Sequence, residues 1–272
     1  MKFINLTTEF IEFLDNKNFS FNSDKLNLYN EKKEKEKKIF NSDNTNKNLD
    51  KVLYKLYNDF DEATKYLLKL KSDNKKIFEF NIKNINHIVD IPKSDGLFDS
   101  SFVPKNIHDV INNESDYTIS YKFKIKDREV TIIFVTCNEN IAFNIEKDNN
   151  YMDNIFIWFY IASNHAFNYC SKKLNVYIYL TNINRILPKS SIHVLEPVNI
   201  NGGVSNVCVK NSLSEIVIFR RQELFKVLIH ETFHNYGLDF SDLTINSLKN
   251  NFKNLFPLNS EMLIFEAYTD YW

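Results

Sequence analysis

Residues 227–237 read VLIHETFHNYG, a mostly apolar stretch that carries two histidines and a glutamate. His230 and His234 are four positions apart, so on an α-helix their side chains point in nearly the same direction, one turn apart. Glu231 is turned by about 100° from His230 and stands beside the pair. Gly237 suits the left-handed residue with which many helices end. The stretch therefore predicts a largely buried helix that presents two imidazoles on one face.

Two neutral imidazoles in this arrangement can bind one zinc ion. Glu231 would lie beside the ion, where a carboxylate can take a proton from zinc-bound water. A catalytic zinc site also needs a third protein ligand and leaves one position open for water. The sequence thus predicts Zn²⁺ as cofactor, His230 and His234 as metal ligands, and Glu231 as the catalytic general base.

The third ligand is expected on a last helix at about 260–272, which contains EAYTD. Glu266 could complete the ligand set. Asp270, one turn later, could accept the remaining N–H of a ligand histidine and so fix its ring orientation.

A competing pattern extends the first motif as H-E-x-x-H-x-x-G-x-x-H/D, as metzincins do, and Gly237 matches it. The ligand position of that pattern is Phe240, and Asp239 lies one place away from it. A carboxylate displaced by one residue is a poor ligand, so Glu266 is preferred.

The chain around this helix alternates between strand and helix patterns. The predicted fold class is α+β, a mixed twisted sheet with helices on one side and an irregular edge strand. Strands are expected at 117–126 and 129–136, which would form a hairpin, and at 175–181, 192–206 and 215–219, with helices at about 151–170, 222–237 and 241–255.

Residues 1–116 are expected to form a mostly helical N-terminal region, and 117–272 the metal-binding domain. Apolar residues at 49–68 recur with helical spacing. Residues 30–50 are low-complexity and charged, which predicts a solvated loop or frayed helix. Weak periodicity over 72–116 indicates a long connection or domain boundary.

Composition excludes several classes of function. The 272 residues carry a net charge of −1, so no nucleic acid or anionic membrane is expected as partner. Three cysteines without C-x-x-C spacing suggest no disulfide framework and a reducing, intracellular setting. No signal peptide is recognised, and the longest apolar run, 154–162, is far shorter than the roughly 18 residues of a membrane span. The oligomeric state is left open.

HETFH at 230–234 followed by EAYTD at 266–270 resembles the gluzincins, the thermolysin-like zinc metallopeptidases. The resemblance covers about 117–272 and implies a zincin-like domain that hydrolyses a peptide or protein substrate. It implies the same three ligands, with Glu231 of the first motif as the base. It also implies that Asp270 accepts a hydrogen bond from a ligand histidine. The block that ends in HETFH is also similar to uncharacterised zincin-like proteins of large DNA viruses.

In zincins the edge strand pairs with extended substrate, and here it would carry Gly202 and Gly203. The resemblance makes these glycines substrate-binding residues; a simple bulge or turn is the alternative. The family often has Asn where this chain has Phe265, and no oxyanion-stabilising residue is identified before the sequence ends two residues after Asp270. A weak or inactive binding or structural protein with a zincin fold is therefore the alternative function.

Overall fold

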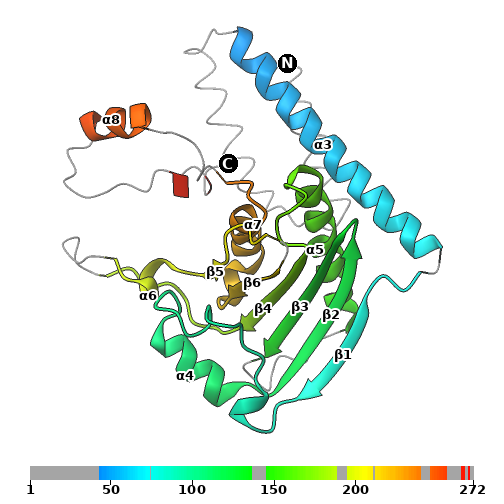
Figure 1. Ribbon diagram of the computed structural model, residues 1–272, viewed down its shortest axis with the longest axis vertical. Helices are drawn as coiled ribbons and strands as arrows, with labels where there is room; N and C mark the ends of the chain where they lie inside the picture. Colours follow the sequence, from blue (N-terminus) through cyan, green and yellow to red (C-terminus); the bar gives the residue numbers. More distant parts are fainter. Residues whose placement is uncertain are drawn as a thin grey trace, which may run out of the picture. The chain divides into compact units, whose positions relative to one another are not determined.

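The computed structural model describes residues 43–73, 75–136, 145–188, 195–210, 212–239 and 246–255, together with Phe265, Glu266 and Thr269 (Figure 1). The chain divides into two compact units, Met1–Leu68 and Lys69–Trp272. Helix α3 (Asp43–Ser72) supplies the described part of the first unit. The predicted loop at 30–50 is described only from Asp43 onward, where it is helical.

A six-stranded mixed sheet forms the centre of the second unit. Its order is β1-β2-β3-β4-β6-β5, so β5 lies at one edge. β4 pairs in parallel with β3 and β6, and the other neighbours are antiparallel. The strands are β1 (Glu79–Asn84), β2 (Tyr117–Ile125), β3 (Arg128–Thr136), β4 (Lys173–Leu180), β5 (Gly203–Ser205) and β6 (Leu213–Ile218). The expected α+β class with a mixed sheet is confirmed at this level.

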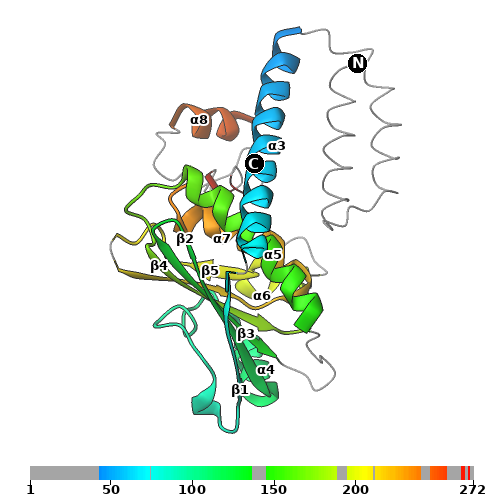
Figure 2. The same cartoon turned by 90° about the vertical axis from the view of Figure 1, so that its right-hand side faces the viewer.

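Helices flank this sheet, as Figures 1 and 2 show. The helices packed on it are α4 (Lys105–Glu114), α5 (Ile145–His165) and α7 (Leu224–Asn235). The other helical segments of the described residues are α6 (Pro197–Ile200), α8 (Asn246–Leu255) and short 3₁₀ turns at Ile88–Asp90 and Arg221–Glu223. No helix of the described residues is both long and apolar enough to cross a membrane.

Helices cover both faces of the sheet, so the expectation of helices on one side is wrong. Ile107 and Ile111 of α4 join a buried cluster with Val217 and its neighbours on one face. On the other face, Phe123 contacts rings of α5. Alternate residues of each strand point to opposite faces, which is why one sheet supports both layers.

The segment 72–116 is not a bare connection. β1 pairs with β2, and α4 belongs to the core, so the second compact unit begins at Lys69 rather than near residue 117. All six residues of β1 are exposed, so the strand lacks the alternation by which a half-buried strand is recognised in a sequence.

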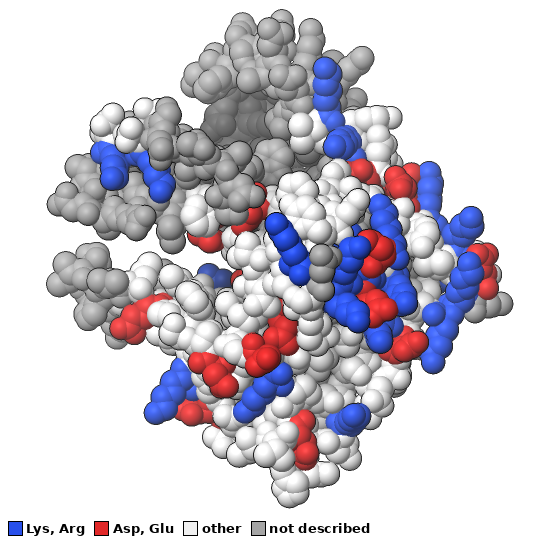
Figure 3. Space-filling model, in the orientation of Figure 1, with Lys and Arg blue, Asp and Glu red and all other residues white. Residues whose placement is uncertain are grey.

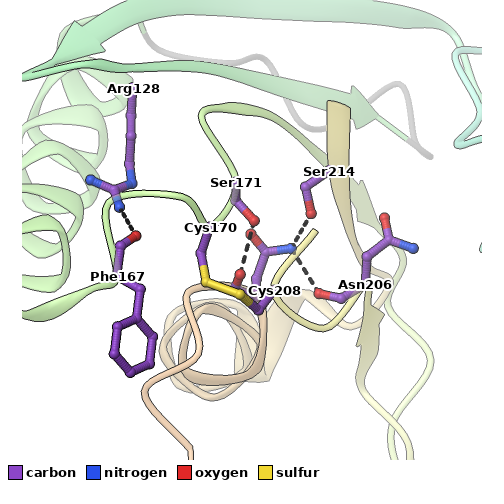
Figure 4. The surroundings of a disulfide bond; sticks show 8 residues. Arg128, Phe167, Cys170, Ser171, Asn206, Cys208 and Ser214 are labelled. Atoms are coloured by element: carbon purple, nitrogen blue, oxygen red, sulfur yellow. Dashed lines mark hydrogen bonds between the residues drawn. A yellow bond between two sulfur atoms is a disulfide. The ribbon is translucent and has the colours of Figure 1, made fainter. Parts of the chain in front are cut away.

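A disulfide joins Cys170 and Cys208, whose Cα atoms are 4.8 Å apart (Figure 4). The expectation of no disulfide was therefore wrong. The two cysteines are 38 positions apart, and they meet because each precedes one of the parallel neighbours β4 and β6. The argument from cysteine usage for a reducing compartment no longer holds.

Charged side chains of both signs are interspersed on the face drawn in Figure 3. This agrees with the near balance of Lys and Arg against Asp and Glu in the composition.

Candidate metal centre

Helix α7 presents both histidines on one face. β6 leads through a 3₁₀ turn directly into this helix, which keeps Leu224, Val227 and Leu228 buried. The Nε2 atoms of His230 and His234 lie 3.1 Å apart. The spacing of four residues produces the predicted pair of converging imidazoles.

Glu266 completes a group of three that could hold a metal ion. Its Oε2 atom lies 3.3 Å from Nε2 of His234 and 3.6 Å from Nε2 of His230. The predicted third side chain is therefore brought to the pair, although it is 32 positions beyond His234 along the chain.

The three atoms fit the dimensions of a zinc site. A circle through them, worked from the three distances, has a radius of about 1.9 Å. Zinc binds imidazole nitrogen and carboxylate oxygen at about 2.0–2.2 Å. The three side chains would therefore fit a zinc ion, and three protein ligands are the number found in catalytic zinc sites.

The electrostatics of the group favour binding of a cation. Burial alone would lower the pKa of His234, but hydrogen bonds with Glu266 and Asp239 and nearby negative charge raise this pKa to about 9. The hydrogen bond with His234 lowers the pKa of Glu266, although burial opposes this. In the metal-free protein, protonated His234 carries the positive charge that the carboxylates of Glu266 and Asp239 stabilise.

Asp239 orients His234. Its Oδ2 accepts a hydrogen bond from Nδ1 of His234 at 2.7 Å, which leaves Nε2 directed at the candidate metal position. The expected orienting residue was Asp270, which lies outside the described residues. The sequence pattern offers Asp239 only as a poor ligand, whereas in the structure it is the orienting partner of His234.

The end of α7 explains how Asp239 reaches the ring. Gly237 has φ of +65°, a left-handed conformation that suits glycine. The N–H of Leu238 donates to the carbonyl of Phe233, and that of Gly237 donates to the carbonyl of His234, the paired bonds of a Schellman motif. The motif reverses the chain immediately before Asp239.

Glu231 follows the candidate ligand His230 on α7, is almost fully buried, and contributes negative charge that raises the pKa of His234. The hydroxyl of Ser205 in β5 donates a 2.7 Å hydrogen bond to Oε2 of Glu231. Sequence reasoning did not identify Ser205. Its only signal was a hydroxyl residue in the predicted edge strand.

Gly202 and Gly203 allow the chain at β5 to approach α7 closely. A Cβ atom on Gly203 would lie 2.6 Å from Cγ1 of Val227, and one on Gly202 would lie 2.8 Å from Cγ2 of the same valine. The close approach is thus to the chain's own helix. Their predicted substrate-binding role stays a prediction.

Arg220 fixes the segments that precede β5. This buried guanidinium donates to the carbonyls of Asn201, Ile183 and Val198 at 2.7–2.9 Å. Desolvation lowers the pKa of Arg220. Three carbonyl partners in place of a carboxylate indicate a structural role, which sequence reasoning did not foresee.

Comparisons with protein-family models, curated proteins and solved structures found no match. The chemistry of the site is therefore argued from its own residues.

Proposed function

We propose that this protein is a zinc-dependent metallopeptidase that hydrolyses peptide bonds at the site formed by His230, His234 and Glu266. One observation supports this above all: three ligand atoms converge at distances suited to zinc, and the negative charge of Glu231, the residue after His230, acts on His234.

The ligand set favours zinc with a catalytic role. Two imidazoles and one carboxylate are typical of catalytic zinc, whereas structural sites use four protein ligands, most of them cysteines. Among the described residues the group has three members, the number of protein ligands in catalytic zinc sites, where water or substrate takes the fourth position.

Each side chain has a defined task. Zinc held by His230, His234 and Glu266 would supply Lewis-acid chemistry, polarising the scissile carbonyl and lowering the pKa of the attacking water. Glu231 is placed to accept the proton of that water and to deliver it to the leaving amine. Asp239 holds the ring of His234 in the orientation that binding requires.

The edge strand offers a place for an extended substrate. β5 is the last strand of the sheet, and in the described part of the chain no further strand pairs with its outer edge. A peptide added there would form main-chain hydrogen bonds beside the site. An antiparallel edge strand next to the histidine helix, together with the glutamate supplied from the C-terminal motif, supports the zincin-like, gluzincin-type arrangement that the two motifs imply.

A peptide-library digest tests the proposal, with wild type compared with Glu231→Gln. Glutamine can still accept the hydrogen bond of Ser205 but cannot act as a base. The rate of cleavage should therefore fall by about 10²-fold or more, while the zinc content stays that of wild type. Glu114→Gln, an exposed change at the end of α4, is the matched control and should cleave as wild type does.

Identical cleavage profiles for wild type and Glu231→Gln would remove the enzymatic proposal. A wild type that binds one zinc per chain yet cleaves no member of the library would instead favour the binding or structural alternative. Protein without metal after zinc-replete expression would remove the enzymatic proposal and leave only the binding or structural alternative.

A further inference from the structure

Residues 203–208 run alongside α7 and approach it at four positions. The pairs are Gly203 with Val227, Ser205 with Glu231, Asn206 with Asn235, and Cys208 with His234. Two of these helix residues are the proposed general base and a proposed metal ligand. The segment is therefore in a position to control where both side chains lie.

The disulfide anchors the far end of this segment. Cys208 is bonded to Cys170, which enters β4, and Figure 4 shows the bond between these two chain segments. The N–H of Ser171 donates to the carbonyl of Val209 at 2.9 Å, and Cys170 forms an isolated bridge with Lys210. The cross-link thus joins the segment to the central sheet.

The same disulfide lies against the last turn of α7. The N–H of Cys208 donates to the carbonyl of His234 at 3.2 Å. A Cβ atom at Gly237 would lie 3.2 Å from Sγ of Cys170, so the sulfur fills the space beside this glycine. Gly237 is the residue whose left-handed turn brings Asp239 to His234.

Two further hydrogen bonds connect the last turn of α7 to residues near the disulfide. The Oγ of Ser171 donates to the carbonyl of Asn235 at 2.8 Å, and Nδ2 of Asn235 donates to Oγ of Ser214 at 2.6 Å (Figure 4). The residue after Cys170 therefore also holds the residue after His234. The disulfide and these hydrogen bonds thus meet at the same turn of the helix.

We propose that the Cys170–Cys208 disulfide positions His234 for metal binding, so that reduction of the two cysteines weakens the metal centre. The inference rests on the metal centre proposed above. Both cysteines are positioning residues, because they act through the last turn of α7 rather than through contact with metal or substrate.

The chemistry of reduction explains the effect. A phosphine gives two electrons to the disulfide, takes an oxygen atom from water to become a phosphine oxide, and the two sulfurs each gain a proton. Sulfurs held at about 2.05 Å by a bond must then separate to van der Waals distance. The two thiols need more room than the bonded pair, and both cysteines lie against the last turn of α7, where Sγ of Cys170 fills the space beside Gly237 and the N–H of Cys208 donates to the carbonyl of His234. Ligands must be held within about 0.5 Å of their productive positions, so metal affinity falls.

The test measures the dissociation constant of the full-length protein for Zn²⁺ by competition with a chromophoric chelator, in the oxidised and the phosphine-reduced state. We expect wild type to bind at least about tenfold more weakly after reduction, the scale at which loss of an orienting partner affects metal sites. A double variant, Cys170→Ser with Cys208→Ser, should bind as weakly in both states. Because it has no thiols at these positions, it also excludes zinc capture by the freed cysteines. Cys137→Ser is the control and should respond to reduction as wild type does.

Circular dichroism of the same samples separates positioning from loss of fold. Equal affinity of oxidised and reduced wild type would overturn the inference and leave the metal centre standing. Loss of the helix and sheet signal on reduction would also overturn it, since the bond would then support the whole fold. No zinc binding in either state would instead remove the proposed function, and this inference with it. If the double variant does not fold, the comparison of the two states of wild type still decides.

Discussion

Replacing Gly203 with alanine should force β5 away from α7. The new Cβ would lie 2.6 Å from Cγ1 of Val227, 2.8 Å from the carbonyl oxygen of Val217 and 3.2 Å from Cγ of Glu231. Ordinary contacts between such atoms are about 3.5–4.0 Å, so the overlap is close to 1 Å. The carbonyl belongs to the backbone of β6, and a valine in a helix has one strongly preferred rotamer, so neither neighbour can move aside.

The expected loss in the free energy of unfolding is about 2–3 kcal/mol, the upper part of the range for overpacking. Urea unfolding of metal-free protein measures it. Gly202→Ala is the matched comparison: its new Cβ would also overlap Val227, at 2.8 Å, but its three nearest neighbours include no backbone atom, so it should lose less, about 1–2 kcal/mol. The reasoning is refuted if Gly203→Ala is as stable as wild type, or more stable than Gly202→Ala.

Three further predictions concern the site and its support. Asp239→Asn should weaken zinc binding about 10–100-fold, since the ring of His234 loses its anionic partner; unchanged affinity in a chelator competition would contradict this role. In protein freed of metal, the pKa of His234 is raised from 6.5 to about 9, so its contribution to stability is complete below pH 6.5 and is lost as pH rises through 9. The free energy of unfolding should fall by roughly 2–3 kcal/mol across that window in metal-free protein and not in zinc-loaded protein, and equal pH profiles of the two would count against it. Joint replacement of Cys170 and Cys208 by serine opens a cross-link between positions 38 apart and should lower the free energy of unfolding by up to about 4 kcal/mol in urea; a loss below about 1 kcal/mol would show that the link adds little.

Local patterns in the sequence predicted the elements that carry the site. The spacing of His230 and His234 requires only the geometry of one helix, so the pair could be placed before any tertiary information was used. The hairpin of β2 and β3 was equally accessible, because its residues alternate between buried and less buried positions along both strands. Glu266 was predicted from its motif, and the structure brings it to the histidines.

Features that depend on tertiary contacts were not predicted. β1 is exposed on both faces, so no alternation marks it. The cysteine pair forms because β4 and β6 are parallel neighbours, a fact of sheet register that spacing along the chain does not contain. Asp239 lies one residue away from the ligand position of the metzincin pattern. The left-handed turn at Gly237 nevertheless brings its carboxylate into a hydrogen bond with the candidate ligand His234.

X-ray diffraction from zinc-loaded crystals, recorded on both sides of the zinc absorption edge, tests the metal centre most directly. We predict one anomalous peak per chain, at about 2.0–2.2 Å from Nε2 of His230, Nε2 of His234 and a carboxylate oxygen of Glu266. Asp239 should remain on Nδ1 of His234, outside the coordination sphere. A peak coordinated by Asp239 in place of Glu266, or no peak at this position, would contradict the account.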